Sequence, residues 1–381
     1  LIVILATRTL MTPEDFAAWG WRIPFLLSIV LLAVSLWIRL QLSESPVFQR
    51  MQQEGAVSKA PLAESFGRWS NLKLVLIALL GGVAGQAVVW YTGQFYALIF
   101  LERLVKLDGF TANALVALAL VIGAPFFIVF GWLSDKVGRK PIIIAGCLLA
   151  AFTYFPLFNQ LTEAANPALA QAQRNAPVVV VADPSACSFQ FDPVGRNKFD
   201  AQSSDVARAF LARAGVSYDN VAAPAGAIAE VRVGQSMVRA PDTARLEGPA
   251  RAEAIAIFQT QAREALDAVG YPAAADPAAV DKPLVVAILA LLVIYVTMVY
   301  GPIAAMLVEL FPTRIRYTSM SLPYHIGNGW FGGFLPTTAF AIVAATGNIY
   351  NGLWYPVIVA LMTALIGLVF LPETFKRDID N

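Results

Sequence analysis

Seven long apolar stretches, separated by polar segments, constrain this chain more than any other feature of its sequence. About 20 apolar residues in a helix span the hydrocarbon core of a bilayer, and such a helix satisfies its own backbone hydrogen bonds. The stretches therefore predict seven membrane helices, with an eighth, partial one at the start of the chain. They lie near residues 22–40, 73–101, 113–133, 141–161, 284–311, 318–345 and 351–371, and the partial one covers 1–11.

The composition excludes several other classes of protein. Hydrophobic residues make up 58% of the chain and charged residues only 14%, which lies outside the range of soluble globular proteins. The net charge of +1 provides no basic surface for nucleic acid. Two cysteines, Cys147 and Cys187, are too few for a disulfide framework or a zinc site. We expect a lipid bilayer around most of the chain, no metal, no bound cofactor and no nucleic-acid partner.

Lysine and arginine gather in alternate loops, which predicts the orientation of the helices. Basic clusters follow the first span, occupy residues 136–140 and 314–316, and return in the tail at 376–377. Short cytoplasmic loops carry the excess of Lys and Arg. We therefore expect a multi-pass protein of the inner (plasma) membrane with these loops and the C-terminus in the cytoplasm.

One long loop departs from this pattern. Residues 163–283 carry 25 of the 53 charged side chains, 14 acidic and 11 basic. Long loops translocate largely regardless of charge, so we place this segment on the periplasmic side. Within it, Val178–Ala182 and Ala229–Val233 have the pattern of strands, and Ser204–Ala214 and Arg251–Val269 that of helices. This predicts a soluble α/β insertion, either a spacer or lid, or a module that binds a solute, a partner protein or wall material.

A tight basic turn joins the third and fourth predicted spans. Asp135 lies at a helix end and Arg139 follows four residues later, so the two side chains can pair and hold the turn against a neighbouring helix end. Gly131 and Gly138 allow close approach and a sharp change of direction. The other interpretation is that the basic residues, Lys140 included, only fix the topology.

A second charged set surrounds the inner end of the fifth span. It contains Glu309, Arg314 and Arg316. Together with Glu44 and Arg50 of the loop after the first span, it is predicted to form a charge network that breaks and re-forms as two helical halves rock. We interpret these side chains as gating residues rather than substrate ligands.

Several motifs resemble those of known transporters. The turn Gly131-x-Leu133-x-Asp135-x-x-Gly138-Arg139-Lys140 resembles the loop signature of the major facilitator superfamily. Other segments resemble the metabolite:proton symporter family within it, which is similar to the sugar porters in several loops. These segments are Trp19-Gly-Trp-Arg-Ile-Pro-Phe-Leu-Leu-Ser28, Glu44-Ser-Pro46, Gly85-Gln-Ala-Val-Val-Trp-Tyr-Thr-Gly-Gln-Phe-Tyr96 and Glu309-Leu-Phe-Pro-Thr-Arg-Ile-Arg316.

The resemblance implies an all-α membrane protein, a helical bundle of the major facilitator superfamily that carries a small soluble α/β insertion. Family members have two six-helix halves, and this chain would correspond to helices 6–12 and the end of helix 5, with the first helices of the same protein as a further partner. The implied divisions are 1–40 for the end of helix 5 and helix 6, 41–72 for the central cytoplasmic loop, 73–162 for helices 7–9, 163–283 for the insertion, and 284–381 for helices 10–12 and the tail.

The resemblance also implies a function. We expect secondary active, proton-coupled symport of a small metabolite such as an organic acid, by alternating access, with an osmolyte or amino acid as the alternative cargo. A membrane-anchored solute-binding or sensing protein that uses the insertion is a second possibility. An enzyme is not expected, because the insertion has no Ser-His-Asp set, metal cluster or glycine-rich phosphate loop.

Polar and aromatic side chains deep in a span are candidate substrate contacts, because in lipid they face a cavity or a partner. Gln86, Trp90 and Gln94 lie at i, i+4 and i+8 on one helix face, with Tyr91 beside them. Two amides and two aromatic rings can hydrogen-bond and enclose a small polar solute. Alternatively, the amides hydrogen-bond across a helix interface.

Tyr324, His325 and Asn328 form a second polar patch in the sixth span. His325 lies nine residues from Arg316, about 13 Å along a helix and hence near mid-membrane. As the only histidine of the chain, it is a candidate to accept the coupled proton or to pair with a substrate carboxylate. The alternative is a packing histidine.

Glycines and one proline predict helix packing and bending. Gly81, Gly85, Gly329 and Gly333 have GxxxG spacing, which favours close helix contacts. The pair Gly301-Pro302 is expected to bend the fifth span and to provide a flexing point for gating.

Overall fold

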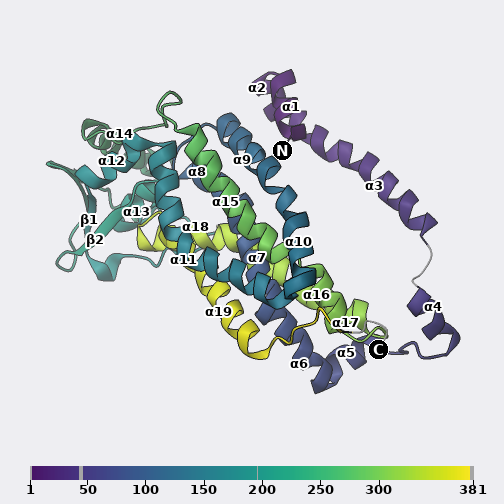
Figure 1. The fold of residues 1–381 in the computed structure, drawn as a ribbon. Helices are drawn as coiled ribbons and strands as arrows, with labels where there is room; N and C mark the ends of the chain where they lie inside the picture. Colours follow the sequence, from purple (N-terminus) through teal and green to yellow (C-terminus); the bar gives the residue numbers. More distant parts are fainter. Residues whose placement is uncertain (1, 43–45, 195, 378–381) are drawn as a thin grey trace.

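The computed structural model describes residues 2–42, 46–194 and 196–377. Within these ranges seven helical segments are long and apolar enough to cross a membrane, which confirms the number predicted. All except the first pack together in one bundle, with the insertion at one end (Figure 1). The segments are Gly20–Gln41, Trp69–Arg103, Gly109–Val137, Arg139–Ala165, Lys282–Leu310, Arg316–Thr346 and Asn351–Phe370.

Two of the spans are interrupted by π-helical turns. The second span consists of α6 (Trp69–Ala78), η2 (Leu79–Val83), α7 (Ala84–Tyr91), η3 (Thr92–Tyr96) and α8 (Ala97–Arg103). The sixth consists of α17 (Arg316–Ile326), η5 (Gly327–Gly332) and α18 (Leu335–Thr346). The turns η2, η3 and η5 are π-helical, a geometry that is frequent at functional sites. Both interrupted spans carry the predicted substrate contacts.

The fifth span is interrupted at its glycine and proline, where the sequence predicts a bend. Helix α15 (Lys282–Tyr300) ends at Gly301 and α16 (Ile303–Leu310) begins after Pro302. Proline has no backbone N–H for the helical hydrogen bond and its ring crowds the preceding turn, so the helix cannot continue unchanged.

Helix α11 (Arg139–Ala165) packs against α15 and against α19 (Trp354–Phe370). Helices α9 (Gly109–Gly123) and α10 (Pro125–Val137) cover α15. Rings of Tyr96, Phe100 and Phe158 are fully buried, and those of Phe100 and Phe158 meet edge to face at 5.0 Å between centroids. Lipid tails are as apolar as these rings, so close packing rather than transfer from water holds the helices together.

Close glycine packing occurs at only some of the predicted positions. Added Cβ atoms at Gly81 and Gly85 would lie 3.2 and 2.6 Å from atoms of α19, which confirms the contact there. The prediction is wrong for Gly329, where a Cβ would meet nothing within 4 Å, and for Gly333, where it would meet only its own helical segment. The wide π turn η5 changes the register, and Gly332 makes the contact with α7 instead.

The insertion folds as a four-stranded mixed sheet in the order β2-β1-β3-β4. Strand β1 (Val178–Ala182) pairs in parallel with β2 (Tyr218–Ala222) and antiparallel with β3 (Glu230–Val233), which also pairs with β4 (Ser236–Arg239). Helix α13 (Ser203–Ala214) connects β1 to β2, and α14 (Gly248–Ala268) follows the sheet. Both predicted strands and both predicted helices are confirmed. The sequence analysis missed β2, β4 and α12 (Pro167–Asn175).

The module is hydrogen-bonded to two loops of the bundle. The backbone N–H of Tyr218 donates to the carbonyl of Gly347 at 2.8 Å, in the loop between the last two spans. Lys106 lies in the loop before α9, and its Nζ donates to the carbonyl of Arg213 at 2.9 Å. The backbone carbonyl of Lys106 accepts from the N–H of Ala275 at 3.0 Å. Burial lowers the pKa of Lys106, and Arg263 adds to this effect. Backbone groups of the module thus hold it against these two loops of the bundle.

The chain leaves the bundle for the module and returns to it at one point. Helix α11 extends through Ala165, and α15 begins at Lys282. The N–H of Asp281 donates to the carbonyl of Ala164 at 2.9 Å. The two connections to the module therefore lie side by side.

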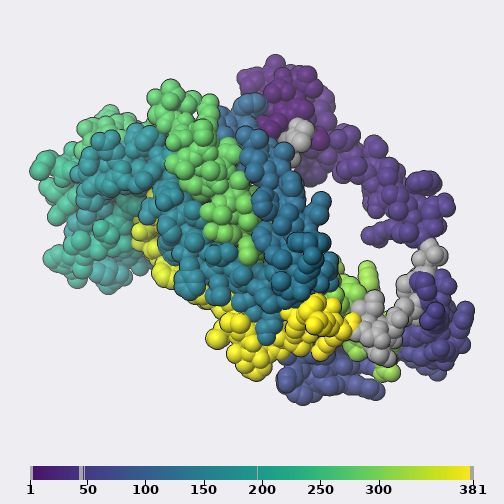
Figure 2. Space-filling view, viewed as in Figure 1, coloured from purple at the N-terminus to yellow at the C-terminus, as the bar shows by residue number. Residues whose placement is uncertain are grey.

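The first span stands away from the bundle. Helix α3 (Ile23–Gln41) has no buried residue, while α1 (Ile2–Leu10) contacts α9. Figure 2 shows open space between α3 and the bundle. After α3, a central segment with α4 (Pro46–Gln53) and α5 (Pro61–Gly67) leads back to α6. An apolar helix with all faces open needs lipid or other helices around it.

Candidate functional site

The two predicted polar patches meet inside the bundle. Gln86 of α7 donates from Nε2 to Oδ1 of Asn328 in η5 at 3.3 Å. Asn328 donates from Nδ2 to the backbone carbonyl of Tyr324 at 2.9 Å. The Gln86 side chain is fully buried. Such an amide pair satisfies polar groups that lipid would leave unpaired, and it joins the second and sixth spans.

Aromatic side chains from the second, fifth and sixth spans contact one another, and they include Tyr324, whose backbone carbonyl Asn328 binds. The ring of Trp90 lies 5.1 Å from that of Tyr91 and 5.6 Å from that of Tyr300, between centroids. The hydroxyl oxygens of Tyr300 and Tyr324 are 2.9 Å apart and share a hydrogen bond. Tyr300 was missed by sequence analysis, and its only signal is its position directly before the Gly301-Pro302 break. The rings offer stacking faces and the hydroxyls offer donors to one small region.

Two predicted residues lie apart from the amide pair. Gln94 is half-buried in η3, where the wider π turn takes it out of the α-helical register with Gln86 and Trp90. His325 is exposed on the bundle, with its ring edge to face with that of Tyr324 at 5.8 Å. We therefore regard Gln86, Trp90, Tyr91, Tyr324 and Asn328, with Tyr300, as one cluster and His325 as a neighbouring surface group.

A charged network occupies the opposite end of the bundle from the module. The guanidinium of Arg139 contacts Asp135, as the spacing predicts, and binds Glu309 of α16 at 2.9 Å from Nη2 to Oε1. It also donates from Nη1 to the hydroxyl of Ser134 at 2.7 Å. Arg139 is buried, and its charge is stabilised because two carboxylates face it. The network joins α10, α11 and α16.

The turn itself depends on one of its two glycines. Gly138 has φ +107°, a conformation that other residues rarely adopt. A Cβ added to Gly131 would meet no atom within 4 Å, so crowding around its own α-carbon does not require glycine there.

The sequence analysis missed a carboxylate of the tail that completes this network. Glu373 accepts the backbone N–H of Arg139 at 2.9 Å and that of Lys140 at 3.2 Å, at the N-terminus of α11. The hydroxyl of Thr374 donates to Oε2 of Glu309 at 2.7 Å. Lys140 donates from Nζ to the last carbonyls of α19, at 2.9 Å from Leu368 and from Leu371. A carboxylate at a helix N-terminus and an ammonium at a C-terminus are both favoured by the helix dipole.

The second predicted charged set is divided between two places. Glu309 belongs to the network of Arg139, whereas Arg314 pairs with Glu64 of α5. Arg316 donates from Nε to the carbonyl of Phe311 at 3.1 Å. Glu44 lies outside the described residues. In the described residues Glu309 thus contacts Arg139 and Thr374, and Arg314 contacts Glu64. The single charge network predicted for these side chains stays a prediction.

Within residues 2–42, 46–194 and 196–377, no group of three or more His, Cys, Asp or Glu side chains could hold a metal ion.

Known families match both parts of the bundle. Residues 16–160 match the Major Facilitator Superfamily, and residues 268–381 match the family described as Sugar (and other) transporter. The unmatched stretch between them falls on the module. No solved structure matches the chain.

Two curated relatives are similar over part of the chain. The shikimate transporter of Escherichia coli (strain K12) is 32% identical over 166 residues, which is 42% of this chain and 36% of that protein. The alpha-ketoglutarate permease of the same organism is 30% identical over 167 residues, 44% of this chain and 37% of that protein. The matched part of the chain thus spans little more than a third of the length of either relative.

Proposed function

Because the chain belongs to the major facilitator superfamily, we propose that it is the C-terminal part of a secondary transporter that moves a small metabolite by alternating access. The observation that carries this proposal is the cluster of polar and aromatic side chains from α7, α15, α17 and η5. It joins three membrane spans of the bundle, and the Gln86 side chain in it is fully buried. Polar groups at such depth are costly in lipid and are therefore expected to serve a solute pathway.

The cluster contains suitable groups for a small polar solute. The amides of Gln86 and Asn328 already exchange hydrogen bonds with each other, so a solute can replace one partner without leaving the other group buried and unpaired. The hydroxyls of Tyr300 and Tyr324 share one hydrogen bond, which leaves one of the two O–H groups as a donor for a solute. We assign substrate contact to these groups and to the rings of Trp90 and Tyr91.

Organic acids are the cargo that we propose first. Shikimate and alpha-ketoglutarate, named for the two relatives, both carry carboxylates. Amide N–H groups and tyrosine hydroxyls can bind a carboxylate, and a protonated His325 would provide a positive charge nearby. In this proposal His325 also takes up the coupled proton.

A zwitterionic osmolyte or amino acid is the second candidate, because of the aromatic rings. The ring of Trp90 lies within 6 Å of the rings of Tyr91 and of Tyr300, between centroids. Aromatic faces such as these attract a quaternary or secondary ammonium group. Such a cargo brings its own positive charge and does not need one from the protein.

We assign the charged network to gating. Asp135, Arg139, Glu309 and Glu373 tie four segments together at the end that we place in the cytoplasm. Arg314 and Glu64 tie the central segment to the same end. The helices of this half would then rock as one body, with Gly301-Pro302 as the point that flexes.

Uptake into proteoliposomes tests the proposal. The full-length carrier is reconstituted under an imposed proton gradient with labelled shikimate, dicarboxylates, citrate, proline or betaine. We expect gradient-dependent uptake of one compound, lowered about tenfold or more by Trp90→Ala. Trp132→Ala, at an exposed position of α10, is the matched control and should retain uptake.

Two results would contradict the proposal. Equal losses in the two tryptophan variants would remove the cluster from substrate binding. Absence of uptake for every compound, combined with solute binding to the module in the full chain, would support the sensing function instead.

A further inference from the structure

A loop of the module turns its polar side chains inward. The loop covers residues 188–194, between β1 and α13. Asp205 of α13 is buried and accepts twice from Ser188, at 3.0 Å from the backbone N–H and at 2.6 Å from the hydroxyl. Gln190 is also buried, and its Nε2 donates to the backbone carbonyl of Asp205 at 3.1 Å. Two alternate residues of the loop are thereby fixed against α13.

The apolar side chains of the same loop lie on the surface. Phe189 is 79% exposed, and Phe191 and Val194 are exposed as well. The rings of Phe189 and Phe191 stack on each other, with 6.0 Å between their centroids. Single exposed apolar residues are common, but a patch of them on a loop that hydrogen bonds hold in place marks a surface for a membrane or another protein.

The loop lies beside the sixth membrane span. It shares a cavity of about 530 Å³ with α18, which forms the last part of that span. The cavity is lined by Pro193 and Val194 of the loop and by Thr337, Phe340 and Ala344 of α18. The exposed patch is therefore next to a helix that crosses the membrane.

The height of the module along this span is fixed by hydrogen bonds. Tyr218 of β2 donates from its hydroxyl to the carbonyl of Ala344 at 3.3 Å, and from its backbone N–H to that of Gly347 at 2.8 Å. Phe340 lies six residues, or about 9 Å, before the end of α18 at Thr346. The whole span has 31 residues, about 46 Å of helix, against a hydrocarbon core of about 30 Å. A centred span thus extends about 8 Å beyond the core at each end, so Phe340 lies near the boundary between headgroups and acyl chains.

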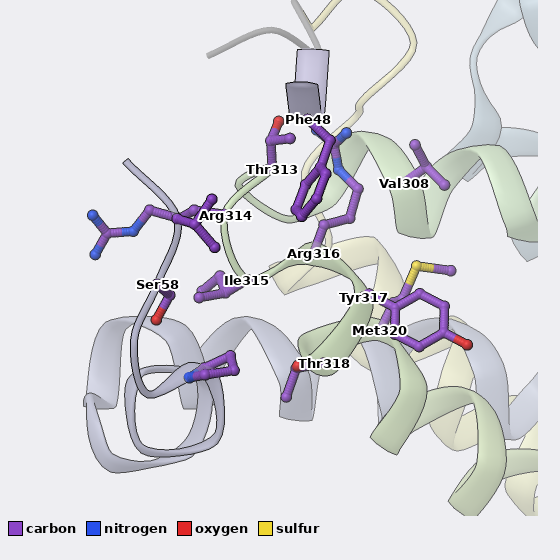
Figure 3. A pocket seen from close by; sticks show the side chains of 12 residues that line it. Phe48, Ser58, Val308, Thr313, Arg314, Ile315, Arg316, Tyr317, Thr318 and Met320 are labelled. Atoms are coloured by element: carbon purple, nitrogen blue, oxygen red, sulfur yellow. The ribbon is translucent and has the colours of Figure 1, made fainter. Parts of the chain in front are cut away.

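The sixth span has an exposed aromatic side chain at its other end as well. Tyr317, in the first turn of α17, is exposed and borders the cavity shown in Figure 3. Aromatic side chains at both membrane interfaces are typical of membrane proteins. Tyr317 belongs to the span itself, whereas Phe189 and Phe191 belong to the module and lie beside the opposite end of the span.

Charged side chains limit how deeply the loop can enter a bilayer. Asp192 accepts the backbone N–H of Asn197 at 2.6 Å, and Arg196 and Lys198, which follow the loop, are exposed. Interfacial segments bury their apolar side chains about 5 to 10 Å into the boundary and keep charged groups among the lipid headgroups. The composition of the loop suits this shallow arrangement.

We propose that the loop 188–194 is an interfacial anchor, which inserts Phe189, Phe191 and Val194 into the leaflet on the module's side. Lipid rather than another protein covers the patch, because the loop lies beside a membrane span at the headgroup boundary. The module is then held by the bilayer as well as by its hydrogen bonds to the bundle.

Spin labels on the full-length carrier in phosphatidylcholine vesicles test the anchor. A nitroxide is attached to Phe189→Cys in a background without other exposed cysteines, which requires Cys187→Ser in this chain because Cys147 is buried. Met237→Cys is the matched control, since Met237 is 65% exposed in β4, at the opposite edge of the sheet from β2. We expect collisions with a water-soluble nickel complex to be about fivefold less frequent at position 189 than at 237, and collisions with oxygen about twofold more frequent.

Two results would overturn the proposal. Equal access of the nickel complex to positions 189 and 237 would show that the loop lies in water. Protection of position 189 from both reagents would show that a protein surface, of a partner or of a second copy, covers the patch instead of lipid.

A second set of variants separates anchoring from folding of the module. In the double variant Phe189→Ser with Phe191→Ser, a nitroxide on Val194→Cys should meet the nickel complex about threefold more often, because the loop loses its apolar contacts with lipid. Met237→Ser, at another exposed position of the module, should leave that label unchanged. A similar rise in both backgrounds, or no rise in the double variant, would overturn the anchor.

Discussion

Replacing Glu309 by glutamine should destabilise the bundle far more than replacing Asp135 by asparagine, although both carboxylates face the same guanidinium. The side chain of Arg139 is 9% exposed and that of Glu309 13%, whereas that of Asp135 is 64% exposed. Water therefore screens the pair of Asp135 with Arg139 and hardly reaches the pair of Glu309 with Arg139.

The expected magnitudes follow from this difference. Removing one partner of a buried ion pair costs about 3 to 5 kcal/mol when nothing compensates. In Glu309→Gln the guanidinium keeps Asp135 and Ser134, and the glutamine carbonyl can still accept a hydrogen bond, so we expect about 2 kcal/mol. An exposed pair contributes about 0 to 1 kcal/mol, which sets the expectation for Asp135→Asn.

Thermal unfolding of the purified protein in detergent measures both variants. On the scale of about 2 to 4 °C per kcal/mol, Glu309→Gln should lower the midpoint by about 4 to 8 °C and Asp135→Asn by less than about 4 °C. High salt should reduce the effect of Asp135→Asn and leave that of Glu309→Gln nearly unchanged. Equal losses in the two variants, or a larger loss for Asp135→Asn, would refute the burial argument.

Three other predictions concern the module and the bundle core. Gly347→Ala should destabilise the protein by more than the roughly 1 kcal/mol expected for Gly226→Ala. Both glycines have φ near +80°, but only at Gly347 does a carbonyl oxygen of β2 lie within 2.6 Å of the added Cβ. Amide exchange at the start of β2 measures the difference, and equal effects of the two variants would contradict it. Hydrogen bonds from Gly226 and Ser185 lower the pKa of Asp183, so its stabilisation is present above the ordinary Asp pKa of about 3.9 and is lost as pH falls through the lowered value. The protection of the Gly226 amide, measured against its intrinsic exchange rate at each pH, should therefore fall in acid. This pH dependence should be absent in Asp183→Asn. Phe158→Ala should cost about 2 kcal/mol from the cavity alone, against almost nothing for the exposed Phe152→Ala on the same helix, and thermal unfolding that ranks them the other way would refute this.

The spans were predictable because membrane helices are specified by local composition and length. The expected stretch at 284–311 and the observed Lys282–Leu310 differ by two residues at most. The break at Gly301-Pro302 was predictable for the same reason, since proline acts on its own helix. Strand β2 was not predictable from the sequence. It lies at the sheet edge and four of its five residues are exposed, so its sequence lacks the alternation of apolar and polar residues that indicates a strand.

The candidate site could be predicted only where the signal is local. The pairing of Asp135 with Arg139 follows from a spacing of four residues. The bond between Gln86 and Asn328 crosses 242 positions, and the one between Glu309 and Arg139 crosses 170. No periodicity relates such residues. Their meeting depends on how the spans pack, and that packing includes π turns which shift the register.

The hydrogen bond between Asp281 and Ala164 has a consequence for the ancestry and engineering of this chain. Both ends of the module meet at one point, so a turn of a few residues would be enough to reconnect the two helices if the module were excised. Loop-closure entropy grows only slowly with length, and the reverse event, acquisition of a whole folded unit at this turn, therefore costs little. Neither excision nor insertion of the module changes the order in which the spans of the bundle follow one another. Excision would come at the cost of the hydrogen bonds that Gly347 and Lys106 make to the module.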